Sequence, residues 1–114
     1  MQKLTILIDM DNIPPSDLGA LVASITATHS DVTLKCDQFI QYDAYDDGPL
    51  VLMHIDVTAA DEWTLDDIVS TLQLLEKRQP EVFKHVRMSQ DAQDTCDLII
   101  SLYHAAYPEA IICQ

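Results

Sequence analysis

One apolar segment near the N-terminus constrains the fold more than any other part of the chain. The segment 3–8, Lys-Leu-Thr-Ile-Leu-Ile, is almost continuously apolar and ends at Asp9, and Pro14-Pro15 prevents a strand from continuing. An apolar run without alternation is typical of a strand that is covered on both faces, as in a parallel sheet. We therefore predict a central strand over 3–8.

The remaining apolar patterns alternate between helical and strand spacing. They predict helices that begin near Ser16, Thr64 and Ser89, and strands over 32–40, 50–57, 82–88 and 110–113, the first two as a hairpin. Strands alternating with helices favour a three-layer α/β fold with a mostly parallel sheet and helices on both faces. With 114 residues, the chain is expected to form a single domain.

Charge and composition limit the classes of function. Nineteen acids against six bases give a formal charge of −13, so the field repels nucleic acid and attracts cations or basic proteins. No apolar run is long enough to span a membrane, and no secretion signal is present, which predicts a cytoplasmic protein. Three cysteines among apolar residues, Cys36, Cys96 and Cys113, are interpreted as buried free thiols in a reducing compartment.

The best local signal for chemistry is the segment Asp9-Met10-Asp11-Asn12. Two carboxylates separated by one residue can both approach a hard cation such as Mg²⁺, and the end of a strand is where α/β sheets bind ligands. The alternative is structural: Asp11 and Asn12 cap a turn before Pro14-Pro15. The sequence leaves both interpretations open.

A second group of acids, Asp91, Asp94 and Asp97, opens the third predicted helix at a spacing of three residues. Asp91 and Asp94 are explained as cap and first-turn acids. Asp97 precedes an apolar stretch, where a carboxylate needs a partner or a metal ion.

Other chemistry-bearing residues give weaker signals. The four histidines show no metal-ligand spacing and are interpreted as structural, and Trp63 is interpreted as a core or helix-staple residue. The two glycines, Gly19 and Gly48, provide no phosphate-binding loop, so a P-loop or dinucleotide site is not expected.

Three segments resemble NYN domains, a branch of the PIN-like ribonucleases. The segment Ile6–Pro14 resembles the opening motif, in which an apolar strand is followed by Ile-Asp, two variable residues and Asn. The segment Asp94–Leu102 resembles the family's later helix, and Glu109–Ile112 resembles the strand that leads to its last acidic motif. The chain ends at Gln114, where that acidic motif would begin, so we expect a truncated or shortened relative.

The resemblance implies a ribonuclease that depends on Mg²⁺ or Mn²⁺. By position, Asp9 would be the first-strand metal ligand, Asn12 its orienting partner and Asp97 the helix acid, with Asp11 and Asp94 as further metal ligands. Asp94 stands where the family often has a lysine. An incomplete acidic site predicts weak or lost activity on RNA, and the final strand could be completed by another copy or protein.

Two other functions remain open at this point. Asp9 and Asp11 also resemble the first motif of haloacid-dehalogenase-type phosphatases, with Asp9 as nucleophile and Lys84 as a later lysine. The charge instead favours a small acidic binding or inhibitor protein, of the immunity or nucleic-acid-mimic type, that acts on a basic partner. Its acidic face would include Asp43, Asp46, Asp47, Asp56, Asp61 and Glu62.

Overall fold

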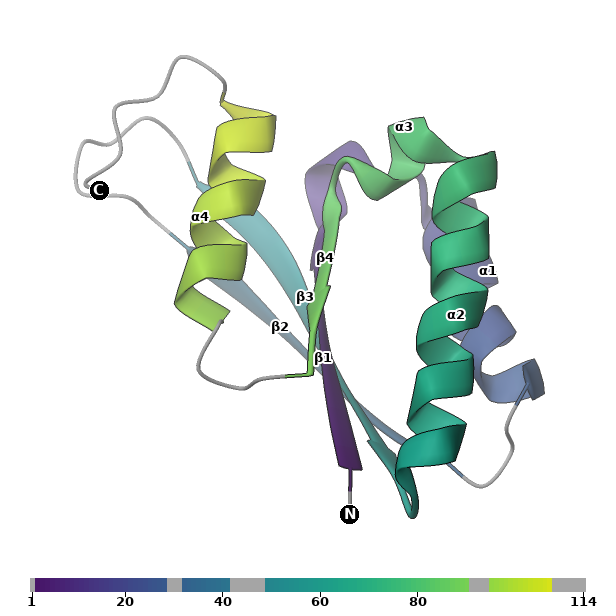
Figure 1. Cartoon of the computed structure of the whole chain (residues 1–114). Helices are drawn as coiled ribbons and strands as arrows, with labels where there is room; N and C mark the ends of the chain where they lie inside the picture. Colours follow the sequence, from purple (N-terminus) through teal and green to yellow (C-terminus); the bar gives the residue numbers. More distant parts are fainter. Residues whose placement is uncertain (1, 29–31, 42–48, 91–94, 108–114) are drawn as a thin grey trace.

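A computed structural model describes residues 2–28, 32–41, 49–90 and 95–107 of the chain. Helices and strands alternate along it, as the sequence patterns predict (Figure 1). In chain order the elements are β1 (Gln2–Asp9), the 3₁₀ turn η1 (Met10–Asn12), α1 (Pro15–Thr28), β2 (Thr33–Gln41), β3 (Leu50–Ala59), α2 (Glu62–Arg78), α3 (Pro80–Phe83), β4 (Val86–Ser89) and α4 (Thr95–Ala106). The predicted strand over 110–113 lies outside the described residues.

The sheet has the strand order β2-β3-β1-β4, and every neighbouring pair is antiparallel. The prediction of a mostly parallel, PIN-like sheet is therefore wrong. The central position of β1 is correct, since β1 lies between β3 and β4, and the predicted hairpin is the β2–β3 pair.

The connections explain why the alternation of strands and helices is misleading. Helix α1 joins β1 to β2, which run in the same direction, but β3 lies between them. Likewise α2 and α3 join β3 to β4 across β1. Two interleaved β-α-β units of this kind give the split arrangement of ferredoxin-like folds, in which parallel strands are never neighbours.

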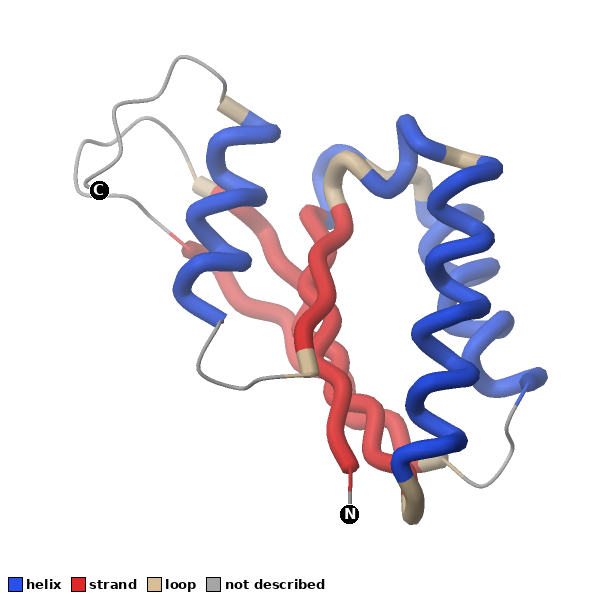
Figure 2. Tube along the Cα trace, viewed as in Figure 1, coloured by secondary structure: helices blue, strands red, loops and turns tan. Residues whose placement is uncertain are grey.

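Both faces of the sheet are covered, which accounts for the apolar run in β1. Leu4, Ile6 and Ile8 belong to the larger core cluster, with α1 and α2, and Leu7 belongs to a second cluster with α4. Figure 2 shows α1 and α2 on one side of the sheet and α4 on the other. A strand buried on both sides reads as a continuous apolar run whichever direction its neighbours take.

Polar contacts as well as apolar ones hold α4 on its face. Arg87 Nε donates to Ser101 Oγ at 2.7 Å, and the Tyr107 hydroxyl donates to the Pro49 carbonyl at 2.9 Å. Arg87 pairs with Leu7 of β1, so Ser101 lies beside Leu7. The contact of Tyr107 with Pro49 lies further along the sheet, so α4 runs in the same direction as β1 (Figure 1). The later half of α4 therefore lies toward the carboxyl end of β1.

Three boundaries differ from the prediction. The helix expected to begin near Ser89 is α4, which begins at Thr95, and Ser89 is the last residue of β4. Residues 80–83 form α3 instead of the start of a strand, since Pro80 occupies the first helical position, where its ring fits a helix. Helix α2 begins at Glu62, and its N-cap is Asp61 rather than Thr64. Within the described segments, none of the helices has the length and apolarity to cross a bilayer.

Candidate functional site

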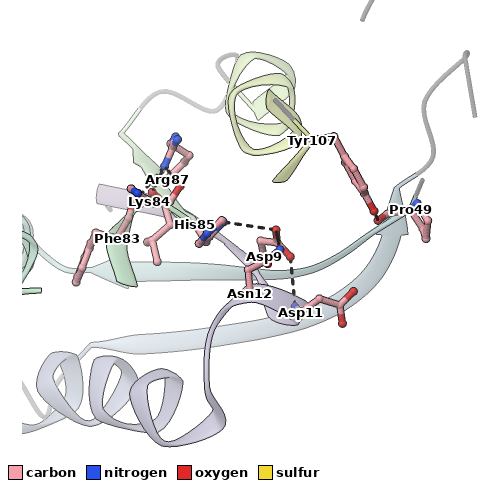
Figure 3. A network of polar contacts seen from close by, with 10 residues as sticks. Asp9, Asp11, Asn12, Pro49, Phe83, Lys84, His85, Arg87 and Tyr107 are labelled. Carbon is pink, nitrogen blue, oxygen red and sulfur yellow. Dashed lines mark hydrogen bonds and ion pairs between the residues drawn. The ribbon is translucent and has the colours of Figure 1, made fainter. Parts of the chain in front are cut away.

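Asp9, the last residue of β1, is the centre of a compact hydrogen-bond network (Figure 3). Its Oδ2 accepts a hydrogen bond from Asn12 Nδ2 at 2.6 Å, and its Oδ1 accepts one from the Asp11 backbone N–H at 3.3 Å. The side chain of Asp9 is fully buried. Asp9 is thus the N-cap of the η1 turn, and its carboxylate stabilises the sharp exit from the sheet.

His85 closes the network from the side of β4. Its backbone carbonyl accepts from the Asp9 N–H at 2.9 Å, which extends the β1–β4 ladder by one residue. Its ring Nδ1 lies 3.7 Å from Asp9 Oδ2, too far for a hydrogen bond, and has no hydrogen-bond partner. The sequence interpretation of the histidines as structural did not identify this contact, because the two residues meet only through strand pairing.

The geometry leaves Asp9 little access to a ligand. A shallow hollow of ≈ 560 Å³ beside η1 is lined by Asp11, Asn12 and their neighbours, but not by Asp9. Asp9 is fully buried and its two oxygens hold the η1 turn, so a Mg²⁺ ion would reach it only after this turn rearranged. The arrangement fits a turn cap better than it fits a metal ligand or a nucleophile.

Asp97 lies in the first turn of α4 and is exposed. It precedes Ser101 by four helical residues, about 6 Å, whereas Asp9 lies beyond Leu7 by two strand residues, about 6.6 Å. Ser101 contacts Arg87, which pairs with Leu7, so Ser101 and Leu7 lie at the same level of the sheet. Asp97 lies before this level and Asp9 lies beyond it. The structure therefore brings Asp11, Asn12 and His85 to Asp9 but places Asp97 toward the other end of the sheet.

The other proposed ligands add no cluster that the structure can show. Asp94 lies outside the described residues, and Asp11 is exposed with only its backbone N–H on Asp9. Among the residues that the structure describes, no three His, Cys, Asp or Glu side chains lie close enough together to hold a metal ion. Lys84, the candidate phosphatase lysine, is largely exposed and pairs with Glu81 at 3.1 Å.

The sheet face that carries α4 holds a second acid–base pair. His54 Nε2 lies 3.0 Å from Asp56 Oδ1, and the Thr5 hydroxyl donates to the same oxygen at 3.5 Å. Both His54 and Asp56 are about one-third exposed. Asp56, which the sequence analysis assigned to an acidic face, therefore has polar partners within the fold, His54 and Thr5.

The amino end of α2 carries a different kind of surface. Trp63 is 72% exposed, although the sequence interpretation placed it in the core or in a helix staple. It lies among exposed acids, namely Asp61, Glu62 and Asp66. We call these four residues the Trp63 patch.

The choice of N-cap explains the misplaced tryptophan. If Thr64 were the cap, Trp63 would precede the helix, where a hydrophobic residue packs back onto the first turn. Instead Asp61 Oδ1 accepts from the Thr64 N–H at 2.7 Å, so Trp63 is already inside the helix. Thr64 and Leu65 then face the core, and Trp63 faces solvent.

The acids of the Trp63 patch have different effects on α2. Asp61 caps the helix and Glu62, in its first turn, complements the helix dipole, whereas Glu62 and Asp66 also form a like-charge pair at i, i+4, a spacing that disfavours a helix. Asp66 Oδ1 accepts a 3.4 Å hydrogen bond from Gln90 Nε2, a weak contact with the chain after β4. Negative charges around an exposed aromatic ring form a surface that attracts a cation.

Comparisons with known proteins identify no function for the chain. No protein-family model and no curated protein matches the chain. Among solved structures, it is similar to the de novo designed protein Foldit4, with 12% identity and a TM-score of 0.49 over 78% of this chain and 93% of that chain.

Proposed function

We propose that this chain is a binding protein that docks onto a cationic surface of a partner protein through the Trp63 patch. The observation that carries the proposal is the exposure of Trp63, at 72%, among three exposed acids. Tryptophan buries a large area at interfaces and is enriched among the residues that dominate binding energy. A partner arginine or lysine would meet both the ring face and the carboxylates.

The charge of the whole chain supports the same function. A net charge of −13 speeds the approach of basic proteins and slows that of nucleic acid. The repulsion between Glu62 and Asp66 would be relieved once a cation lies between them. This supports the acidic binding protein over a ribonuclease, whose substrate would have to approach against the field.

The surroundings of the candidate catalytic acids support this choice. In a nuclease Asp9 would have to coordinate a metal ion, and in a phosphatase it would have to attack a phosphorus atom. Asp9 is buried and its oxygens accept hydrogen bonds from Asn12 and Asp11, so it would first have to give up the η1 cap. The side chains of Glu62 and Asp66 in the Trp63 patch are exposed instead.

The test uses Trp63 as its own reporter, because it is the chain's single tryptophan. Blocked hexa-arginine is titrated into the protein at 0.15 M salt, and tryptophan fluorescence is followed beside isothermal titration. We expect saturable binding that alters the Trp63 emission and weakens as salt rises. Trp63→Ala should weaken binding about fivefold, the scale of one exposed cation–π contact.

A charge-matched pair of double variants localises the effect. Glu62→Gln with Asp66→Asn removes two charges from the Trp63 patch, whereas Glu76→Gln with Glu81→Gln removes two exposed charges elsewhere. The first pair should weaken binding clearly more than the second. Equal losses for both pairs, with an unchanged Trp63→Ala affinity, would reduce the interaction to net charge and contradict the proposal.

The cysteines bear on where such a protein works. Cys36 and Cys96 are free and exposed, so their interpretation as buried thiols is wrong, and Cys113 lies outside the described residues. Exposed free thiols are stable in a reducing compartment and oxidise outside it. The cytoplasm is therefore the location that we propose.

A further inference from the structure

A groove of ≈ 1000 Å³ lies between α2 and β4, and none of its lining residues belongs to the Trp63 patch. One wall is a stripe on α2 at helical spacing, Ser70, Gln73, Leu74 and Lys77. Its floor includes Phe83, Val86 and Met88, which belong to or pack against the main core. Leu74 is 56% exposed although it is a large apolar side chain.

The open side of the groove is an edge of the sheet. Within the described segments, β4 pairs with β1 and with no strand on its other side. The hydrogen bond from the Asp9 N–H to the His85 carbonyl fixes which residues of β4 are hydrogen-bonded to β1. Every second residue of β4 after His85 follows suit, so the backbone groups of Arg87 and Ser89 face β1. Those of Val86 and Met88 consequently point outward, toward the groove's open side.

One of these outward groups has a partner in the chain itself. Arg87 Nη1 donates to the Val86 carbonyl at 2.8 Å, and also to the carbonyl of Lys84 at 2.8 Å. A carbonyl oxygen has two lone pairs and can accept once more. The Val86 N–H and both backbone groups of Met88 complete a short template for another strand.

The charge of the groove is opposite to that of the molecule. Lys77, Lys84 and Arg87, half of the chain's six basic residues, line it. Glu76 also lines it, and Glu81 pairs with Lys84 at its rim. In a chain of charge −13, this is where a negatively charged segment finds attraction.

We propose that the groove binds an extended segment of a partner protein that adds to β4 as a further strand and carries apolar and acidic side chains on its face toward α2. Its backbone would pair with Val86 and Met88. Because every second side chain of a strand points to the same face, residues two apart in the segment would place an apolar side chain against Leu74 and an acid near Lys77. This surface is independent of the Trp63 patch.

The test titrates the full chain, by isothermal titration at low salt, with a blocked heptapeptide in which isoleucine and glutamate take turns at every second position and serine fills the positions between them. Lys77→Glu should weaken binding about fivefold, the upper range for one exposed charge pair. Arg78→Glu makes the same charge change on the neighbouring residue, which does not line the groove, and should change affinity less than about twofold. Leu74→Ser, an exposed site, tests the apolar contact without disturbing the core.

The peptide backbone is tested separately. N-methylation of the residues facing Met88 removes strand hydrogen bonds and should weaken binding about tenfold. Equal binding of the methylated peptide, or equal effects of Lys77→Glu and Arg78→Glu, would overturn the proposal. So would a dimer in sedimentation that Leu74→Ser dissociates, because the occupant would then be a second copy of the chain.

Discussion

The carboxyl end of β1 and the amino end of α2 both gather aspartates, but they use them in opposite ways. Asp9 is fully buried, and its two oxygens accept hydrogen bonds that hold η1. Glu62 and Asp66 are exposed beside an exposed tryptophan and add repulsion to the helix. The comparison teaches that burial and hydrogen-bond occupancy, more than motif position, separate a structural carboxylate from one available to a partner.

The largest expected effect comes from removing the buried carboxylate. Asp9→Ala should lower the free energy of unfolding by about 2–3 kcal/mol, because it removes two hydrogen bonds to a charged group and leaves Asn12 without its partner. Urea denaturation followed by circular dichroism measures it. Asp11→Ala is the matched control: it keeps the backbone N–H and should stay within about 0.5 kcal/mol. Equal effects of the two variants would show that the Asp9 network is not structural.

A smaller loss of stability is expected when Asn12, the donor of the hydrogen bond to Asp9 Oδ2, is replaced. Asn12→Ala should cost about 1–2 kcal/mol, because Asp9 Oδ2 loses its 2.6 Å donor while remaining buried. Asn12→Asp should cost more, since it places a second carboxylate where the amide N–H was. If Asn12→Ala left stability unchanged in the same denaturation experiment, another donor would have to satisfy Asp9.

Replacing the tryptophan of the Trp63 patch should leave the stability of the fold nearly unchanged. Trp63→Ala is expected to change the free energy of unfolding by less than about 0.5 kcal/mol, because 72% of the side chain is already exposed. Thermal unfolding measures this beside the binding assay. A loss above about 2 kcal/mol would mean that Trp63 contributes to the core after all.

The smallest expected effect is that of divalent metal. Addition of 1 mM Mn²⁺ should leave the unfolding midpoint unchanged, since a ligand stabilises a fold only by binding its native state. Asp9→Asn provides the comparison. A Mn²⁺-dependent rise in the wild type that disappears in Asp9→Asn would restore the metal site and the ribonuclease interpretation.

The sequence predicted local structure well and long-range arrangement poorly. The apolar run of β1 and the hairpin of β2 and β3 depend on neighbouring residues and were correct. Sheet direction was wrong because it depends on which strand inserts between β1 and β2, a choice that the β-α-β pattern does not contain.

The same limit applies to the candidate site. The Asp9-Met10-Asp11-Asn12 motif identified a real polar cluster and a capped turn, but the cap is Asp9, to which Asp11 and Asn12 donate, rather than Asp11 and Asn12 themselves. Asp9 and Asp97 were expected as ligands of one metal site, but antiparallel neighbours end at opposite edges of the sheet, so the ends of β1 and β4 do not bring these two residues together. Trp63 was missed because the sequence interpretation took Thr64 as the N-cap, whereas Asp61 caps α2 and places Trp63 inside the helix.

The most direct test of the account compares two variants in one binding experiment. The dissociation constant of blocked hexa-arginine is measured by isothermal titration for Asp9→Asn and Trp63→Ala, at a temperature where circular dichroism shows both folded. We predict that Asp9→Asn binds within about twofold of the wild type, while Trp63→Ala binds about fivefold more weakly. Loss of binding in Asp9→Asn with full binding in Trp63→Ala would place the functional site at the end of β1 and contradict the account.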